Sequence, residues 1–123
     1  RDLGSEGAGT ADVGLKRAIN EGHVPGPRLI VATRALVAPG SYAPKNDAWA
    51  VPQGAEEADG PNLVSAVRRQ IGAGADVVKL YGDYRWRPGE GSRPTYSQAE
   101  IAAAVAAAHD AGRPVAVHAN TAE

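Results

Sequence analysis

Two short apolar runs, each with one basic side chain toward its carboxyl end, constrain the fold of this chain more than any other feature. Residues 75–83 (Ala-Asp-Val-Val-Lys-Leu-Tyr-Gly-Asp) hold Lys79, and residues 114–120 (Pro-Val-Ala-Val-His-Ala-Asn) hold His118. Apolar, β-branched runs bounded by turn formers predict buried strands. One loop and one helical pattern separate them, as in a parallel βαβ unit. We therefore expect two neighbouring parallel strands that carry Lys79 and His118 to one edge of a sheet.

The rest of the chain alternates helical and strand patterns. The expected elements are a helix over residues 11–21 capped by Thr10, a strand over 28–35, a helix that starts near Pro61, and a helix over 98–111 with a Ser97–Glu100 capping box. Residues 37–60 and 83–96 are expected to form long loops. This alternation predicts an α/β fold with parallel strands, whose sites occupy loops at the carboxyl ends of the strands.

Composition excludes several classes of protein. The 123 residues suffice for one domain with a modest core, and no apolar run approaches the roughly 20 residues of a membrane span. The net charge of −1, from mixed charges, argues against nucleic acid or an anionic membrane as a partner. The absence of cysteine excludes disulfides and thiolate metal sites. Because the chain begins with arginine instead of methionine, we expect a segment cut at both ends. We expect it to be soluble, and its compartment, cytoplasmic or exported, stays open.

Lys79 and His118 are the candidate chemical groups. Strand alternation places Val77, Lys79 and Tyr81 on one face of their strand. Three roles suit such a lysine: snorkelling to solvent, a Schiff-base amine, or a metal ligand once the ammonium has become an anion. His118 is either a core histidine or, at the end of a parallel strand, a ligand for a divalent metal such as zinc. The patterns around His23 and His109 indicate structural roles.

Five blocks of the sequence resemble metal-dependent amidohydrolases, in the branch of imidazolonepropionase-like and Xaa-Pro dipeptidase-like enzymes. The blocks are Arg-Asp-Leu-Gly at the start, Ile-Asn-Glu-Gly-His-Val-Pro-Gly-Pro-Arg-Leu, Thr-Arg-Ala-Leu, Gly-Ala-Asp-Val-Val-Lys-Leu and Val-Ala-Val-His-Ala-Asn-Thr. The resemblance implies a (β/α)₈ TIM barrel. Residues 1–123 would be a partial barrel domain covering about strands two to five, with residues 1–4 closing strand two and residues 28–35 forming strand three.

The resemblance also implies a metal centre. Lys79 matches a fourth-strand lysine that is carboxylated to a carbamate bridging two metal ions, usually zinc, and His118 matches a fifth-strand ligand. The complete enzyme would hydrolyse C–N bonds of amides, peptides or cyclic amides with a metal-activated hydroxide. The strand-one His-x-His pair, the sixth-strand histidine and the eighth-strand aspartate that serves as general base have no match here. Ser41 and Tyr42 stand where the family often has a histidine, and no catalytic base is identified.

Loop residues complete the candidate site and leave other functions open. The expected substrate pocket, for a small molecule or a peptide, contains Tyr42, Trp49, Tyr81, Arg85 and Trp86. The expected partners besides substrate are the remainder of the barrel or other copies of the chain, and the segment alone is expected to be inactive. Two alternatives are a Schiff-base lyase that uses Lys79 and a catalytically inert fragment or structural subunit. A barrel hosts many chemistries, so the fold does not decide among them.

Overall fold

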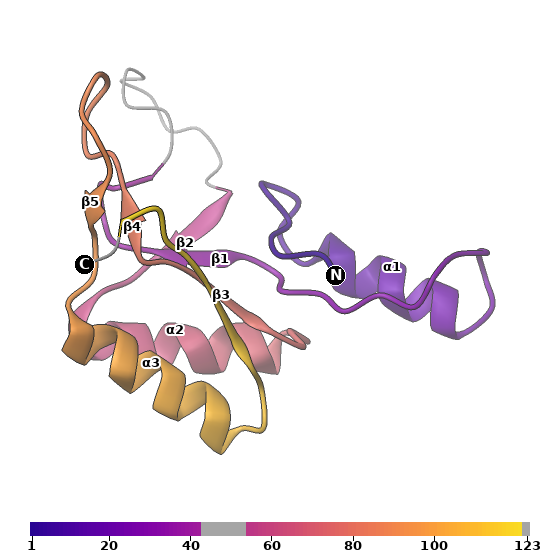
Figure 1. Ribbon diagram of the computed structural model, residues 1–123. Coiled ribbons are helices and arrows are strands. Elements are labelled where there is room, and N and C mark those ends of the chain that lie inside the picture. The colour runs from indigo at the N-terminus through magenta and orange to yellow at the C-terminus, as the bar shows by residue number, and fades with distance from the viewer. Residues whose placement is uncertain (43–53, 122–123) are drawn as a thin grey trace.

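A four-stranded parallel sheet with two helices on one face forms the centre of the molecule (Figure 1). The computed structural model describes residues 1–42 and 54–121. Its elements are α1 (Ala11–Asn20), β1 (Ala35–Val37), β2 (Ala55–Glu57), α2 (Gly60–Gly72), β3 (Val78–Tyr81), β4 (Asp83–Tyr84), β5 (Arg93–Pro94), α3 (Gln98–Asp110) and β6 (Val115–His118). The strand order is β2-β1-β3-β6. Parallel strands alternating with helices confirm the predicted fold class.

The helices cover the sheet through alternate residues of its strands. In β3, Val78 and Leu80 are buried and belong to the core formed with α2 and α3. Leu80 is in register with Leu36 of β1 and Val117 of β6. Burying a leucine or valine side chain stabilises the fold by roughly 1.5–3 kcal/mol. Because this packing fixes which face of β3 meets the helices, Lys79 must lie on the opposite, open face, as the alternation predicted.

One hydrogen bond at their amino ends links α2 and α3, and the residue that accepts it also caps α3. The Ser97 hydroxyl accepts a hydrogen bond from the Glu100 backbone N–H at 3.1 Å, and Glu100 Oε1 accepts one from the Ser97 N–H at 3.0 Å. The predicted capping box is therefore present. Glu100 Oε2 also accepts a hydrogen bond from the Gly60 N–H at 2.7 Å. In contrast, Thr10 occupies the N-cap position of α1 but makes no side-chain capping bond.

The predicted strand over residues 28–35 is wrong in position. This stretch has only a bridge between Asp2 and Val31, and the strand itself, β1, begins at Ala35. Thr33 adopts a positive φ of 60°, in the left-handed region, which interrupts extended backbone. The buried side chain of Asp12 accepts the Thr33 N–H at 2.8 Å, so a side chain takes the place of a ladder partner.

The predicted loop over residues 37–60 contains a strand, β2, that pairs in parallel with β1. Side chains from neighbouring elements fix this strand. The Arg34 guanidinium donates to the Ala55 carbonyl at 2.9 Å. The Gln70 side chain of α2 donates to Glu56, accepts the Thr33 hydroxyl at 2.7 Å and accepts the Arg34 N–H at 3.3 Å. The loop predicted over residues 83–96 likewise contains a short hairpin of β4 and β5.

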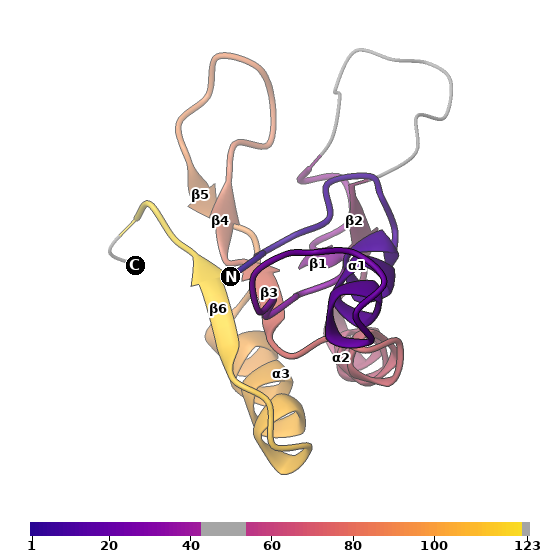
Figure 2. The same ribbon diagram turned by 90° about the vertical axis from the view of Figure 1, so that its right-hand side faces the viewer.

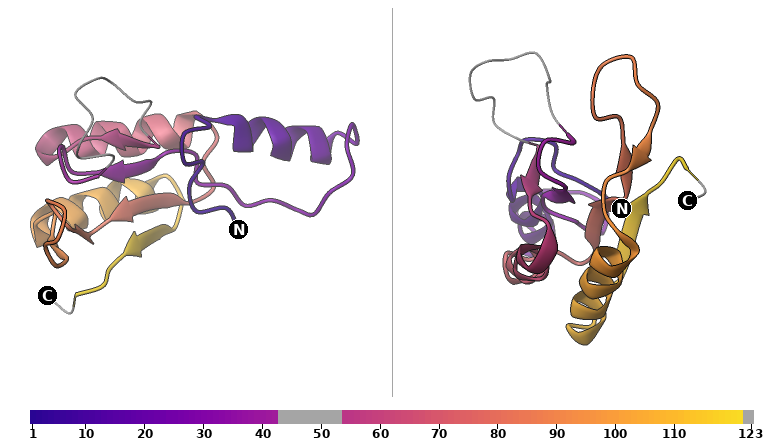
Figure 3. Two further views of the ribbon diagram at one scale, coloured as in Figure 1. Left: turned by 90° about the horizontal axis from the view of Figure 1, so that it is seen from above. Right: turned by 90° about the vertical axis from the view of Figure 1, so that its left-hand side faces the viewer.

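Helix α1 lies beyond the end of the sheet (Figure 3). An ion pair ties it to the segment before β3. Lys16 Nζ donates to both carboxylate oxygens of Asp76, at 2.7 and 2.6 Å. Asp76 also accepts the Val31 N–H at 3.1 Å. None of the helices within residues 1–42 and 54–121 is long and apolar enough to cross a membrane.

Replacing Ser97 with alanine is expected to lower the free energy of unfolding by about 1 kcal/mol, because the Glu100 N–H loses its acceptor. Urea denaturation followed by circular dichroism measures the change. Thr10→Ala is the matched control, and it is expected to cost less because Thr10 makes no capping bond. Equal losses in the two variants would contradict this account of the helix ends.

Asp76 should make stability depend on pH. Burial opposes its ionisation, but hydrogen bonds from Lys16 and Val31, with the charges of Lys16 and Arg113, hold the pKa of Asp76 below its usual value. A carboxyl pKa that is lower in the folded than in the unfolded state stabilises the fold above the unfolded pKa of about 3.9 and loses that effect as pH falls further. We expect Asp76→Asn to be less stable than wild type at neutral pH.

This deficit of Asp76→Asn should shrink as pH falls below about 4, where the wild-type carboxyl takes up its proton. Thermal unfolding across an acid pH series measures it. Lys16→Met should weaken the same pH dependence, because Lys16 is the main group that favours the ionised carboxyl. A deficit of constant size down to low pH would show that the ion pair contributes nothing.

Candidate functional site

Lys79 and His118 lie on the open face of neighbouring strands, away from α2 and α3. Strands β3 and β6 lie side by side (Figure 2). They pair with Tyr81 opposite His118 and Lys79 opposite Ala116. Residues paired across a sheet project to the same face, and so do alternate residues along each strand. Lys79 and His118 therefore lie on one face, with Tyr81 beside both of them.

Aromatic rings gather where these strands end. Tyr42, Tyr81, Tyr84 and His118 form a group that we call the ring cluster. The ring centroid of Tyr81 lies 5.1 Å from that of Tyr42, 5.9 Å from that of Tyr84 and 5.0 Å from that of His118. Lys79 Nζ is 5.3 Å from the Tyr81 centroid, within range of a cation–π interaction. The cluster thus joins both candidate chemical groups to tyrosines from β3, β4 and the segment after β1.

Two tyrosines of the cluster, Tyr42 and Tyr81, are suited to remain neutral. Burial raises the pKa of Tyr42 and Tyr81 above the ordinary tyrosine value, and the charge of Glu6 adds to the effect. The side chains of Tyr42 and Tyr81 are also hydrogen-bonded to each other. Neutral phenols present apolar ring faces and hydroxyl groups that donate or accept hydrogen bonds. The open face therefore offers both stacking and polar contacts to a bound molecule.

The buried carboxylate of Asp83 lies next to the imidazole of His118. Asp83, the first residue of β4, is only 2% exposed. Its Oδ2 accepts the backbone N–H groups of Asn120 and Thr121. Its Oδ1 has no hydrogen-bond partner among the described residues and lies 3.9 Å from His118 Nε2. Burial opposes ionisation, but the hydrogen bonds from residues 120 and 121 and the nearby His118 hold the pKa of Asp83 below its usual value.

Sequence reasoning missed Asp83 and Tyr84. Both come just after the expected lysine strand, in a stretch expected to be an irregular loop, and a polar residue there predicts exposure. Gly82 was the available signal. Its N–H donates to the His118 carbonyl at 2.9 Å, and a Cβ there would lie 2.8 Å from Val117 Cγ1. A glycine between a strand and an aspartate thus marks the point where the two chain segments come close.

The remaining sequence candidates do not join the cluster. Arg85 and Trp86 are exposed in the loop between β4 and β5. Neither forms an ion pair or ring contact with another residue in the described ranges. Trp49 lies outside the described residues. His23 is exposed beside Glu21, and His109 is exposed near the end of α3.

The donors near β3 and β6 suit a divalent metal in kind but not in number. The imidazole of His118 is a common metal ligand, and an unpaired buried carboxylate oxygen lies behind it. Lys79 would have to become an anion before it could bind a cation, because an ammonium offers only donors. No group of three or more His, Asp or Glu side chains within residues 1–42 and 54–121 could hold an ion. A catalytic zinc ordinarily has three protein ligands.

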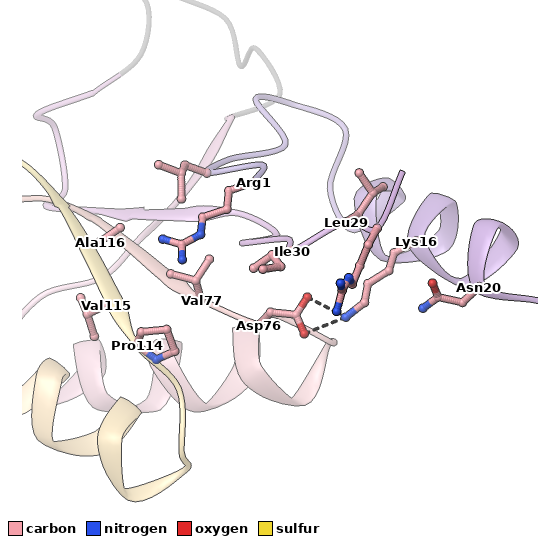
Figure 4. A pocket seen from close by; sticks show the side chains of 12 residues that line it. Arg1, Lys16, Asn20, Leu29, Ile30, Asp76, Val77, Pro114, Val115 and Ala116 are labelled. Carbon is pink, nitrogen blue, oxygen red and sulfur yellow. Dashed lines mark hydrogen bonds and ion pairs between the residues drawn. The ribbon is translucent and has the colours of Figure 1, made fainter. Parts of the chain in front are cut away.

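A cavity of about 550 Å³ lies at the other end of the strands (Figure 4). Its lining residues lie at the amino ends of the strands: Val77 directly precedes β3, and Pro114 directly precedes β6. The Lys16–Asp76 ion pair and the apolar side chains of Leu3 and Ile30 complete its wall. It contains neither Lys79 nor His118, so it is separate from the candidate site.

Solved structures share the fold of this chain. An amidohydrolase is 32% identical over 95% of the chain, with a TM-score of 0.72. A prolidase complexed with N-methylphosphonate-L-proline is 31% identical over 93% of it, with a TM-score of 0.75. A Xaa-Pro dipeptidase with methionine bound in its active site is 30% identical over 91%, with a TM-score of 0.74.

The matched regions cover 32%, 31% and 30% of those three chains, respectively. This chain therefore spans about a third of the length of each. No protein-family model and no curated protein sequence matches the chain.

Proposed function

The chain belongs to the amidohydrolases. We propose that it is part of a larger barrel and that the complete protein hydrolyses an amide or peptide bond. The observation that carries the proposal is the placement of Lys79 and His118. They lie on one face of adjacent parallel strands, near the carboxyl ends, beside the same tyrosine. In barrel enzymes that end of the strands is where chemistry takes place.

We further propose that His118 and Lys79 hold a divalent metal, with zinc as the expected ion and with other ligands supplied by the rest of the protein. For Lys79 this requires a carbamate. The neutral amine forms a bond from Nζ to the carbon of CO₂, the nitrogen releases one proton, and the product carries one negative charge. A bound metal would polarise the scissile carbonyl and lower the pKa of water. A carbamate on Lys79 would also be the group available to hold a second metal ion.

The ring cluster is the proposed substrate wall. Tyr42, Tyr81 and Tyr84 converge from three segments at the end of the sheet, with centroids 5.1 to 5.9 Å apart. Aromatic faces at this spacing stack against flat or apolar groups. The prolidase complex contains a proline derivative, and a proline ring would suit such a wall. The proposed substrate class is therefore a small amide or a dipeptide, with an Xaa-Pro dipeptide as the first choice for assay.

The test is hydrolysis of Xaa-Pro dipeptides and of simple amides by the full-length protein supplied with zinc and bicarbonate. A chelator should abolish turnover, and zinc should restore it. Lys79→Met and His118→Gln should each lower kcat/KM by at least about 100-fold, since even partners of metal ligands cost 10–100-fold. Lys16→Met and His109→Gln are matched controls at remote positions and should keep activity. Full activity in Lys79→Met would contradict the proposal.

Lys79 also tests the competing chemistry. A Schiff-base lyase would form a covalent imine between Nζ and a carbonyl substrate, and borohydride would reduce it to a stable amine. Mass spectrometry of a tryptic digest locates such an adduct. We expect none on Lys79, because a carbamate nitrogen no longer has the free amine that attacks a carbonyl. Trapping on Lys79 together with metal-independent turnover would favour the lyase.

Residues 1–123 expressed by themselves are expected to be inactive and to self-associate. Within the described residues, β6 is an edge strand of the sheet and pairs with β3 only. Its Val117 is 40% exposed. An unpaired strand edge offers backbone groups to another chain. Light scattering and a dipeptide assay with zinc and bicarbonate measure both properties. A monodisperse monomer with metal-dependent turnover would contradict this expectation.

A further inference from the structure

We propose that Asp83 is the positioning residue of His118: its free carboxylate oxygen selects the imidazole tautomer that carries the proton on Nε2 and leaves Nδ1 to bind a ligand. The proposal deepens the proposed function, because that function makes His118 a ligand. The tautomer itself, however, is a property of the protein without any ligand, so it can be measured independently of turnover.

The two oxygens of the Asp83 carboxylate differ in their hydrogen bonds. Asp83 is buried, and only its Oδ2 is satisfied, by the backbone N–H groups of Asn120 and Thr121. Leaving a buried acceptor unpaired is unfavourable, and more so for a charged group. His118 Nε2, 3.9 Å from Oδ1, is the ring nitrogen that faces it. At this distance the two atoms are not hydrogen-bonded, and a bond forms only when the imidazole rotates so that an Nε2–H approaches Oδ1.

Asn120 is the other polar neighbour of the His118 ring. Asn120 Nδ2 lies 2.9 Å from His118 Nε2. An amide can present either its NH₂ group or, after a half-turn, its oxygen at this position, so it can serve either tautomer. A carboxylate can only accept a hydrogen bond. Because Asn120 adapts and Asp83 does not, Asp83 decides which nitrogen carries the proton.

Nδ1 of His118 is the ring nitrogen left for a ligand. No hydrogen bond to His118 Nδ1 is present among the residues that the structure describes. Histidine ligands commonly donate the proton of one ring nitrogen to a carboxylate while the other nitrogen binds the metal. Asp83 also fixes the backbone two and three residues after His118 through its bonds to Asn120 and Thr121. One side chain at the start of β4 thus controls both the position and the protonation of the imidazole.

The experiment is ¹⁵N NMR of the full-length protein labelled at histidine, in the absence of metal, above the ordinary imidazole pKa of about 6.5. His118→Gln identifies the His118 signals. The expected wild-type form carries its proton on Nε2. Asp83→Asn keeps an oxygen for the two backbone N–H groups but turns an NH₂ group toward the ring, so the tautomer should shift to Nδ1–H. Asp110→Asn, on the exposed end of α3, is the matched control and should leave the spectrum unchanged.

A second variant keeps the test decisive if Asp83→Asn fails to fold. Asn120→Ala removes the amide but leaves Asp83 and the backbone bonds in place, so the Nε2–H tautomer should persist. Calorimetric titration with zinc adds a further readout, and Asp83→Asn should weaken binding by about 10–100-fold. A folded Asp83→Asn protein that keeps the Nε2–H form, or an Asn120→Ala protein that adopts the Nδ1–H form, would overturn the proposal.

The two proposals fail in different ways. A wild-type protein with its proton on Nδ1 that still hydrolyses dipeptides would refute the role of Asp83 and leave the proposed function intact. A protein with the proton on Nε2, sensitive to Asp83→Asn but without any metal-dependent hydrolysis, would support the role of Asp83 and refute the function.

Discussion

The pairing of β3 with β6 is the constraint on which the candidate site depends. The register sets Tyr81 opposite His118 and puts Leu80 and Val117 on the helix side. A shift of one residue would turn every side chain of one strand to the other face. Past the strand end, Gly82 donates its N–H to the His118 carbonyl and leaves no space for a side chain. This close approach brings the start of β4 against the segment after β6.

Local sequence patterns correctly predicted those helices and strands that are determined by their own residues. The strands β3 and β6 and the helix α3 were expected within a few residues of their actual bounds, because apolar alternation and a capping box are local signals. The strand over residues 28–35 was misplaced because Thr33 takes a left-handed backbone held by Asp12 and Gln70, which lie far away in sequence. The sequence Ala-Glu-Glu of β2 has no strand pattern, and only its neighbours make it one.

The candidate site was predictable in its strand residues and not in its supporting ones. Lys79 and His118 follow from position alone, since polar groups near the ends of adjacent parallel strands lie close together. Asp83 could not be recognised as buried, because its burial depends on backbone N–H groups more than thirty residues later in the chain, at 120 and 121. Arg85 and Trp86 lie in the loop at the same end of the sheet and are exposed, so their place in the substrate pocket stays a prediction.

Gln70 has a consequence for how this part of the molecule opens. One amide joins α2 to the Thr33 hydroxyl, to the Arg34 N–H and to Glu56 of β2. A local fluctuation that frees β2 must therefore also disturb the bend before β1 and the last turn of α2. Segments coupled in this way open as one cooperative unit, and their amide protons share one free energy of opening. The outer strand of the sheet, only three residues long, thus shares the protection of the helix behind it.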